Sequence, residues 1–197
     1  MKKLVFASMN TGKVKEIQAL LSPLGIDIVS QSEFDVPEIE ETGLSFIENA
    51  ILKARNAARH TGFAALADDS GLCVEALNGA PGIYSARFAG TAKDDDANIS
   101  KLLSVLDGQH KRAAAFKCVL ALVRTYDDPV PVICEGELCG RISRDRKGKH
   151  GFGYDPVFYP ENHTKTLAEF SAQEKNKISH RACAFLQMRA YFTGLCR

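Results

Sequence analysis

Strands and helices alternate over the start of this chain, and this alternation limits the possible folds more than any other feature. The apolar run 4–7 predicts a strand, and Asn10 can cap the helix that follows it. Residues 26–29 predict a second strand, and the Ser-x-x-Glu pattern at 45–48 predicts the start of a second helix, which Gly62 ends. Successive strand–helix units of this kind predict an α/β sheet with helices packed on it.

The second half of the chain carries longer strands. Residues 113–125 and 130–144 predict two long strands joined by a turn at Asp127-Asp128-Pro129, which makes them a hairpin. We interpret the triple acid Asp94-Asp95-Asp96 as the cap of another helix, where its charge complements the helix dipole, in preference to a metal site. A last helix is predicted from about Ser179 to Phe192.

These patterns together predict an α/β fold, a mixed β-sheet flanked by helices with two lobes around a central cleft. The length of 197 residues and the 45% apolar content suit one domain, residues 1–197, built from two such lobes. The net charge of +1 argues against a stable nucleic-acid partner, because proteins that coat DNA carry a basic excess. No apolar run approaches the roughly 20 residues of a membrane span, so we expect no membrane association.

The cysteines point to a reducing compartment. The chain has six of them but no Cys-x-x-Cys pair, and several lie inside apolar runs, where a thiol acts as a small hydrophobic group. This pattern favours neither a zinc site nor a disulfide framework. We therefore expect a cytoplasmic protein.

Two adjacent acids follow an apolar run in the first half of the chain. Residues 63–67 predict a short buried strand, and Asp68-Asp69-Ser70-Gly71 is interpreted as a tight turn at its carboxyl end. Such strand ends are where α/β sheets present their ligands. Two carboxylates there could hold Mg²⁺ and a water molecule to be activated. A plain polar turn is the alternative, since these residues favour turns for local reasons.

A polar turn between the first strand and the first helix suits a phosphate group. Backbone N–H groups at a helix N-terminus, a lysine and two hydroxyls are available there. The candidate residues are Ser8, Met9, Asn10, Thr11, Gly12 and Lys13. The segment is not a P-loop, because the earlier glycine is absent and Val14 stands where the metal-binding hydroxyl belongs. An ordinary capped helix start is the alternative.

An acidic loop precedes the second helix and could complete a metal site. Glu40 or Glu41 could join Asp69 as oxygen ligands of one Mg²⁺, an ion that prefers a few carboxylates plus phosphate and water. Lys53, later on that helix, could reach phosphates if its face turns inward. The alternatives are a solvated loop and a surface lysine.

Two segments near the carboxyl end suit a purine base. In the first, the candidates are Phe152, Gly153, Tyr154 and Asp155, where an aromatic ring can stack on a base. A structural turn with core aromatics is the alternative. In the second, Lys177, His180 and Arg181 at the start of the last helix supply donors for carbonyl or phosphate oxygens. The basic loop 141–150, with Arg144, Arg146, Lys147 and Lys149, is interpreted as a solvated hairpin end in preference to a phosphate clamp.

Six segments, in order along nearly the whole chain, resemble the motifs of the non-canonical purine NTP pyrophosphatases, the Ham-type inosine/xanthosine triphosphate pyrophosphatase family. They are Ser8–Lys13, Glu41–Gly43, Ala67–Gly71, Gly79–Arg87, Phe152–Pro156 and Ser179–Arg181. The Phe-Gly-Tyr-Asp-Pro and Ser-His-Arg segments are the most specific. One departure is Met9, because the family usually begins this loop Thr-Gly-Asn and the glycine that allows close backbone approach to phosphate is lost here.

The resemblance implies hydrolysis of dITP, ITP, dXTP or XTP to the monophosphate and pyrophosphate, with Mg²⁺ as cofactor, in an elongated mixed-sheet protein that forms a homodimer. Asp69 then holds Mg²⁺ and accepts a proton from the water that attacks the α-phosphorus, while Lys13 and Lys53 neutralise the phosphates. Asp68 orients the site, and Ser70 bonds the nucleotide. Donors aimed at the 6-oxo group of hypoxanthine or xanthine reject adenine, whose 6-amino group is itself a donor.

Three other functions remain open at this point. A non-catalytic nucleotide-binding regulator would need the phosphate and base segments but no activated water. A related pyrophosphatase could act on pyrimidine or modified nucleotides. A single-stranded RNA-binding module could use Phe152 and Tyr154 as stacking platforms, although the near-zero net charge disfavours it.

Overall fold

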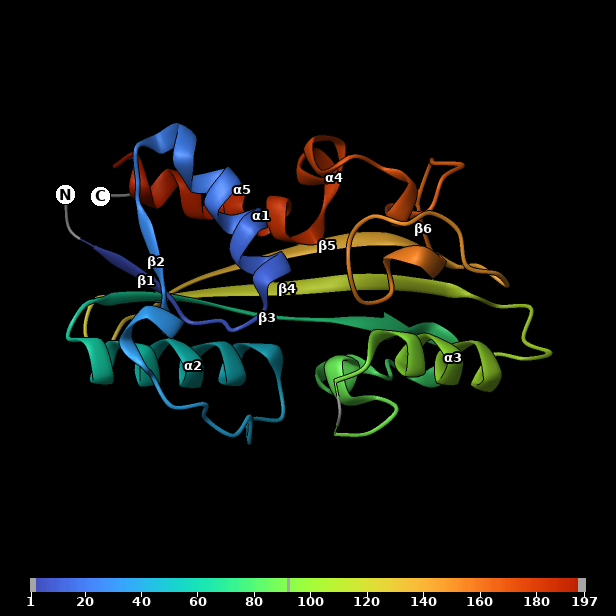
Figure 1. The fold of residues 1–197 in the computed structure, drawn as a ribbon, viewed down its shortest axis with the longest axis horizontal. Helices are drawn as coiled ribbons and strands as arrows, with labels where there is room; N and C mark the ends of the chain where they lie inside the picture. Colours follow the sequence, from blue (N-terminus) through green and yellow to red (C-terminus); the bar gives the residue numbers. More distant parts are fainter. Residues whose placement is uncertain (1–2, 92, 195–197) are drawn as a thin grey trace. The chain divides into compact units, whose positions relative to one another are not determined.

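A computed structural model describes residues 3–91 and 93–194 and places their strands in one six-stranded sheet of order β2-β1-β3-β4-β5-β6 (Figure 1). The strands are β1 (Leu4–Phe6), β2 (Ile28–Ser30), β3 (Ala64–Val74), β4 (Ala113–Val123), β5 (Val132–Ile142) and β6 (Phe158–Pro160). β1 pairs in parallel with β2 and β3, whereas β5 and β6 are antiparallel. The predicted α/β fold with a mixed sheet is therefore confirmed.

The helices begin and end largely where the capping residues predict. They are α1 (Thr11–Leu21), α2 (Phe46–Thr61), α3 (Asp95–Val105), α4 (Ala172–Ile178) and α5 (His180–Phe192). Asn10 accepts a hydrogen bond from the Lys13 amide, and Asp94 accepts two from the first turn of α3. Gly62 ends α2 with a φ of +70°. α4 is a helix that we did not predict, and no helix among the described residues has the length and apolar character to cross a membrane.

The chain forms two compact units. Unit 1 comprises the residues up to Asp69, Cys118–Gly136 and the residues from Arg181 onward, and unit 2 comprises Ser70–Lys117 and Glu137–His180. Strands β3, β4 and β5 contribute residues to both units.

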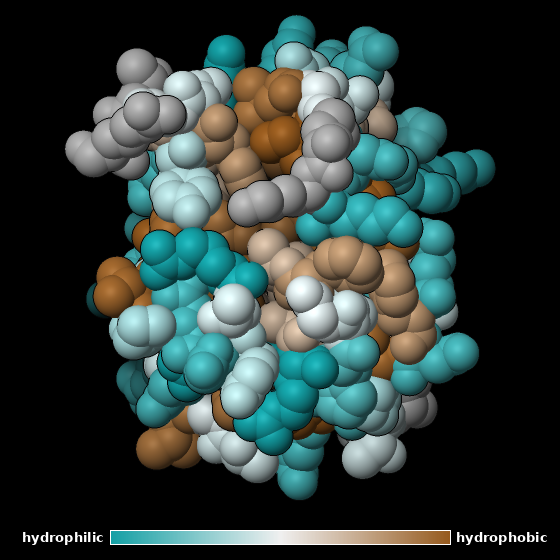
Figure 2. All heavy atoms as spheres, turned by 90° about the vertical axis from the view of Figure 1, so that its left-hand side faces the viewer, coloured by the Kyte–Doolittle hydropathy of each residue, from teal (hydrophilic) through white to brown (hydrophobic). Residues whose placement is uncertain are grey.

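In unit 1, helices cover both faces of the sheet. Leu66 of β3 packs with Ile17 of α1 and Phe185 of α5, whereas Ala65 and Ala67 pack with the alanines of α2. This follows from the period of two in a strand, which sends neighbouring side chains to opposite faces. Figure 2 shows hydrophobic side chains between hydrophilic ones on the surface of this end of the sheet. Such scattered exposure is normal and marks no site.

Unit 2 has a separate core. Leu72 of β3 packs there with Leu102 of α3 and with Phe116 and Phe158, whose ring centroids lie 4.7 Å apart. The same core includes Ile142 at the end of β5 and Leu167 in the loop after β6, so it anchors both loops.

The predicted tight turn at residues 68–71 is wrong, because β3 runs straight through it to Val74. The strand that ends nearby is β1, whose pairing with β3 stops at Leu66, where the Ala7 amide donates to the Leu66 carbonyl at 2.8 Å. β3 can continue because its two acids point to opposite faces, where each has basic partners. The predicted strand at 26–29 also shifts, to Ile28–Ser30.

Candidate active site

Asp68 and Asp69 lie inside β3 in unit 1 and face different helices. Both are buried, with exposed fractions of 1% and 6%. Asp68 points to the face covered by α1 and α5, and Asp69 points to the face covered by α2. Burying ionised groups is costly unless they are paired, so the partners of each acid determine its chemistry.

Asp68 is the centre of a buried ionic network. Its carboxylate pairs with the ammonium of Lys13 and accepts a hydrogen bond from Nε of Arg181 at 2.6 Å and from the thiol of Cys118 at 3.3 Å. Arg181 also pairs with Glu16 of α1. Burial alone would raise the pKa of Asp68, but the charges and hydrogen bonds of Arg181 and Lys13 hold that pKa well below its ordinary value. Asp68 therefore stays ionised.

Asp69 has a sparser environment. Nζ of Lys53 donates to Oδ1 of Asp69 at 2.6 Å and to Oε1 of Glu41 at 2.9 Å, so that one ammonium serves two carboxylates. Burial raises the pKa of Asp69, and the attraction of Lys53 and Lys13 only partly offsets it. The pKa values of two adjacent aspartates are thus shifted in opposite directions. Proteins use such a difference to separate a fixed charge from a proton acceptor.

The second oxygen of Asp69 lacks a partner. Oδ2 is buried, and no residue within 3–91 and 93–194 donates a hydrogen bond to it. A buried oxygen left in this state is costly, so a cation or a water molecule is the expected occupant of the space beside it.

Glu41 and Asp69 suit Mg²⁺. That ion is usually held by one or two carboxylates and completes its coordination with phosphate and water. The two carboxylates already share a cationic group, Nζ of Lys53, and Asp69 offers an unused oxygen. Of the two glutamates predicted as alternatives, Glu41 is the one that lies with Asp69 at Lys53. The described residues contain no group of three acidic, histidine or cysteine side chains fit for a metal. Glu40 is exposed, and its carbonyl accepts from the Thr42 amide.

The polar turn before α1 is ordered by its own side chains. Oγ of Ser8 accepts from the Asn10 amide at 3.2 Å, and Asn10 caps the helix. Met9 is 60% exposed, and Thr11 and Gly12 begin the first turn. The ammonium of Lys13 bonds Asp68, so a phosphate would share this lysine with the acid.

The aromatic loop of unit 2 is held by Asp155. This buried carboxylate accepts from Nζ of Lys175 at 2.5 Å and from the Phe152 amide at 3.0 Å, and the same ammonium lies 4.5 Å from the Phe152 ring centroid. Gly151 adopts a φ of +79°, and a Cβ there would overlap the Asp155 carboxylate. The Gly153 amide donates to Asp95 at 2.6 Å, so the first turn of α3 also holds the loop.

Three predictions for unit 2 need comment. Tyr154 is only 4% exposed and its hydroxyl donates to the Ser85 carbonyl at 2.9 Å, so the prediction that its ring is a stacking platform is wrong. Burial in the core raises the pKa of its phenol. Lys177 lies in the last turn of α4 and does not start the final helix. The buried ring of His180 stacks on Phe116 with centroids 4.9 Å apart.

Sequence reasoning missed Glu16, Cys118 and Lys175. The Ser-x-x-Glu pattern at 171–174, a capping box in the structure, was the available signal for α4 and for the position of Lys175. Nothing local indicates that Glu16 pairs with Arg181 or that Cys118 donates to Asp68. Ser70, which follows Asp69 in β3, is half-buried.

Comparisons with known proteins agree along the chain. A family model described as the Ham1 family matches residues 4–191. The dITP/XTP pyrophosphatase of Coxiella burnetii is 50% identical over 98% of both chains, and that of Thioalkalivibrio sulfidiphilus is 55% identical over 92% of this chain and 94% of its own. A solved HAM1 protein from Coxiella burnetii superposes with a TM-score of 0.91 at 50% identity, over 98% of this chain and 100% of its own. The Staphylococcus aureus Ham1 protein gives 0.87 at 42% identity, over 98% and 99%.

Proposed function

The chain belongs to the Ham1 family, and we propose that it hydrolyses dITP and XTP to the nucleoside monophosphate and pyrophosphate. Relatives that share half of its residues over nearly the full chain carry that name. The structural observation that supports the proposal most is Asp69, a buried carboxylate with a raised pKa and an unused oxygen beside Glu41 and Lys53.

Asp69 acts as the proton acceptor. The oxygen of a water molecule attacks the α-phosphorus, and the bond from that phosphorus to the oxygen bridging to the β-phosphorus breaks. The electron pair of the broken bond leaves with pyrophosphate, and the proton of the attacking water moves to the carboxylate of Asp69. A carboxylate with a raised pKa is the stronger base, which suits it to this transfer.

Glu41 and Asp69 hold Mg²⁺ in this proposal. When bound, the ion neutralises the charge that develops on the phosphate oxygens. Lys53 donates to the same oxygens, and Lys13 supports them from the start of α1. Asp68 does no chemistry itself, since its partners Arg181 and Lys13 keep it ionised and fix β3 against α1 and α5.

Unit 2 recognises the purine. Phe152 presents a half-buried ring for stacking, and the ties of its loop to Lys175 and Asp95 limit its motion. Donors aimed at the 6-oxo group, with His180 and Lys177 as the candidates in this unit, reject adenine by leaving donor against donor. A homodimer in the cytoplasm is part of the proposal, and light scattering in solution tests the dimer directly.

A pyrophosphate-release assay across nucleoside triphosphates tests the proposal. We expect release from dITP, ITP and XTP in the presence of Mg²⁺, rates at least about tenfold lower with ATP, GTP and pyrimidine triphosphates, and none with EDTA. Equal rates for ITP, GTP and ATP would contradict the proposed base recognition. Binding of ITP without any release would mark a regulator in place of an enzyme.

A further inference from the structure

Unit 2 carries a strongly basic cavity outside the aromatic loop. It has a volume of about 550 Å³ and lies where β5 ends, next to β6. Its lining includes four cationic side chains against a single carboxylate, that of Asp145; the cations are Arg112, Arg141, Arg144 and Lys147. The whole chain has a net charge of only +1, so this local excess is unusual for the molecule.

The floor of the cavity is rigid. The guanidinium of Arg112 donates to three backbone carbonyls, those of Leu106, Ile142 and Ser143, at 2.7–2.9 Å. These acceptors orient the group but carry no full charge, and the only carboxylate that acts on it noticeably is that of Asp107. Also in the lining, Arg141 stacks on Tyr159 with 4.5 Å between guanidinium carbon and ring centroid.

The cations of the cavity differ from their neighbour in the same loop. Arg146, which does not line the cavity, is paired with Asp96 at 2.5 Å. For Arg112, Arg141, Arg144 and Lys147, the part of the chain that the structure describes supplies no carboxylate within salt-bridge distance, although Tyr159, and after it Glu169 and Asp145, help to raise the pKa of Lys147. Burial lowers the pKa of Arg112, and the nearby charge of Arg144 lowers it further, while Asp107 offsets part of the change.

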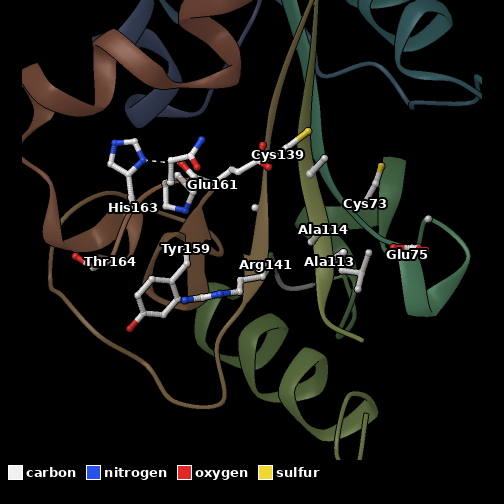
Figure 3. A pocket seen from close by; sticks show the side chains of 16 residues that line it. Cys73, Glu75, Ala113, Ala114, Cys139, Arg141, Tyr159, Glu161, His163 and Thr164 are labelled. Atoms are coloured by element: carbon white, nitrogen blue, oxygen red, sulfur yellow. Dashed lines mark hydrogen bonds between the residues drawn. The ribbon is translucent and has the colours of Figure 1, made fainter. Parts of the chain in front are cut away.

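An adjoining cavity shows that this charge is local. That cavity, of about 780 Å³, is lined mainly by small side chains and includes the acids Glu75 and Glu161 (Figure 3). The two cavities share Arg141 and Tyr159, and Figure 3 shows the Arg141 side chain extending alongside the Tyr159 ring. The basic character therefore begins at Arg141 and continues only into the smaller cavity.

We infer that the basic cavity of unit 2 binds a phosphate chain, such as inorganic di- or triphosphate or the phosphate tail of a nucleotide. Guanidinium groups recognise phosphate oxygens with paired donors, and several close cations favour a ligand with several adjacent charges. A basic hollow of about 550 Å³ suits a short chain better than a nucleic-acid backbone, which would need an extended basic surface. The assignment stands apart from the proposed function, because it concerns binding and no turnover.

Calorimetric titration of the full chain with inorganic triphosphate, at low salt and with EDTA, tests the site. The test variant is Arg144→Gln with Lys147→Gln, both in the cavity lining. The matched control is Arg146→Gln with Lys149→Gln, which removes the same charge from the same loop outside the lining. We expect the test variant to weaken the dissociation constant of this site at least tenfold and the control to change it less than threefold, while both retain kcat and KM for ITP within about twofold.

Three outcomes would overturn the inference. Absence of any change in the test variant means that the cavity binds no phosphate chain. Equal weakening by the control means that only the overall charge of the loop matters. A parallel rise in KM for ITP means that the cavity is part of the substrate site. Titration with ATP, a non-substrate in the proposed function, distinguishes a nucleotide tail from free triphosphate, since only the tail would bring its nucleoside to the cavity.

Discussion

Asp68 and Asp69 are neighbours in β3, yet the two faces of the sheet give them opposite chemistry. On the face of α1 and α5, Asp68 has two cations and a thiol as donors, and its pKa is lowered despite burial. On the face of α2, Asp69 shares one ammonium with Glu41, and burial raises its pKa. The number of donors around each acid, and not its residue type, decides which one is a fixed charge and which one can take a proton.

Asp69→Asn should abolish most of the activity while the protein still folds. Asparagine keeps the shape of the side chain but accepts no proton, so pyrophosphate release from ITP should fall by about 10³-fold, within the range for loss of a general base. The assay is steady-state pyrophosphate release, with circular dichroism as the control for folding. Activity retained within about tenfold, which is only ~1.4 kcal/mol of barrier, would remove Asp69 from this role.

Asp68→Asn should lower the free energy of unfolding more than Asp69→Asn does. It leaves the buried charges of Arg181 and Lys13 without their shared carboxylate, at a cost of about 3–5 kcal/mol in the free energy of unfolding. Asp69→Asn should cost less, because Lys53 keeps Glu41 as its partner. Urea unfolding of the two variants side by side measures the difference. A larger loss in Asp69→Asn would reverse the comparison.

Separate substitutions of the two glutamates of the acidic loop test which of them holds the metal on the α2 face. Glu41→Gln removes a carboxylate that shares Lys53 with Asp69, so we expect the Mg²⁺ concentration for half-maximal activity to rise about 10-fold or more. Glu40→Gln changes an exposed residue and should leave that concentration within threefold. The measurement is pyrophosphate release against Mg²⁺ concentration. An effect confined to Glu40→Gln would place the metal elsewhere.

Lowering the pH should affect activity, through Asp69, before it affects stability, through Asp68. The raised pKa of Asp69 means that kcat/KM falls as the pH drops through a value above 3.8, the ordinary pKa of aspartate. Asp68 has a lowered pKa, so the stability it contributes is present above 3.8 and is lost only as the pH falls through its lower folded value. Protonation of Asp69 does not itself unfold the protein, because the folded state binds that proton more tightly than the unfolded state. Activity should therefore disappear before stability.

Lys53→Met gives the smallest effect and tests how far the ammonium of Lys53 offsets the pKa rise that burial gives Asp69. Without the ammonium, less positive charge favours the Asp69 carboxylate, so the acid limb of kcat/KM should move to higher pH. The shift is read from the pH profile, independently of any fall in kcat. A limb that moves to lower pH would mean that another group titrates.

Local signals predicted the frame of the fold well. The caps at Asn10, Ser45 and Asp94 start helices in the structure, and Gly62 ends one, because caps and turns are determined by neighbouring residues. The turn predicted at residues 68–71 is wrong because that prediction used local preferences alone. Contacts with residues distant in the sequence outweigh the local preference for a turn there. Arg181 lies 113 residues from Asp68 along the chain, and no periodicity can indicate that contact.

The candidate site was only partly predictable. The sequence singled out Asp69, Glu41 and Lys53, and the structure brings these three together in unit 1. It could not separate Glu41 from Glu40, because both are acids in one loop. Tyr154 looked like a stacking residue and is a core residue, since the apolar surroundings of its ring come from β3, α3 and β6.

Titration of the aspartate carboxyl carbons by ¹³C NMR, with signals assigned through Asp68→Asn and Asp69→Asn, tests the division of roles most directly. We predict that the carboxyl of Asp69 takes up its proton above pH 3.8, while that of Asp68 remains ionised to well below that pH. If Asp68 titrates first, or if both carboxyls titrate together, then the two faces of β3 do not distinguish their acids and the account is wrong.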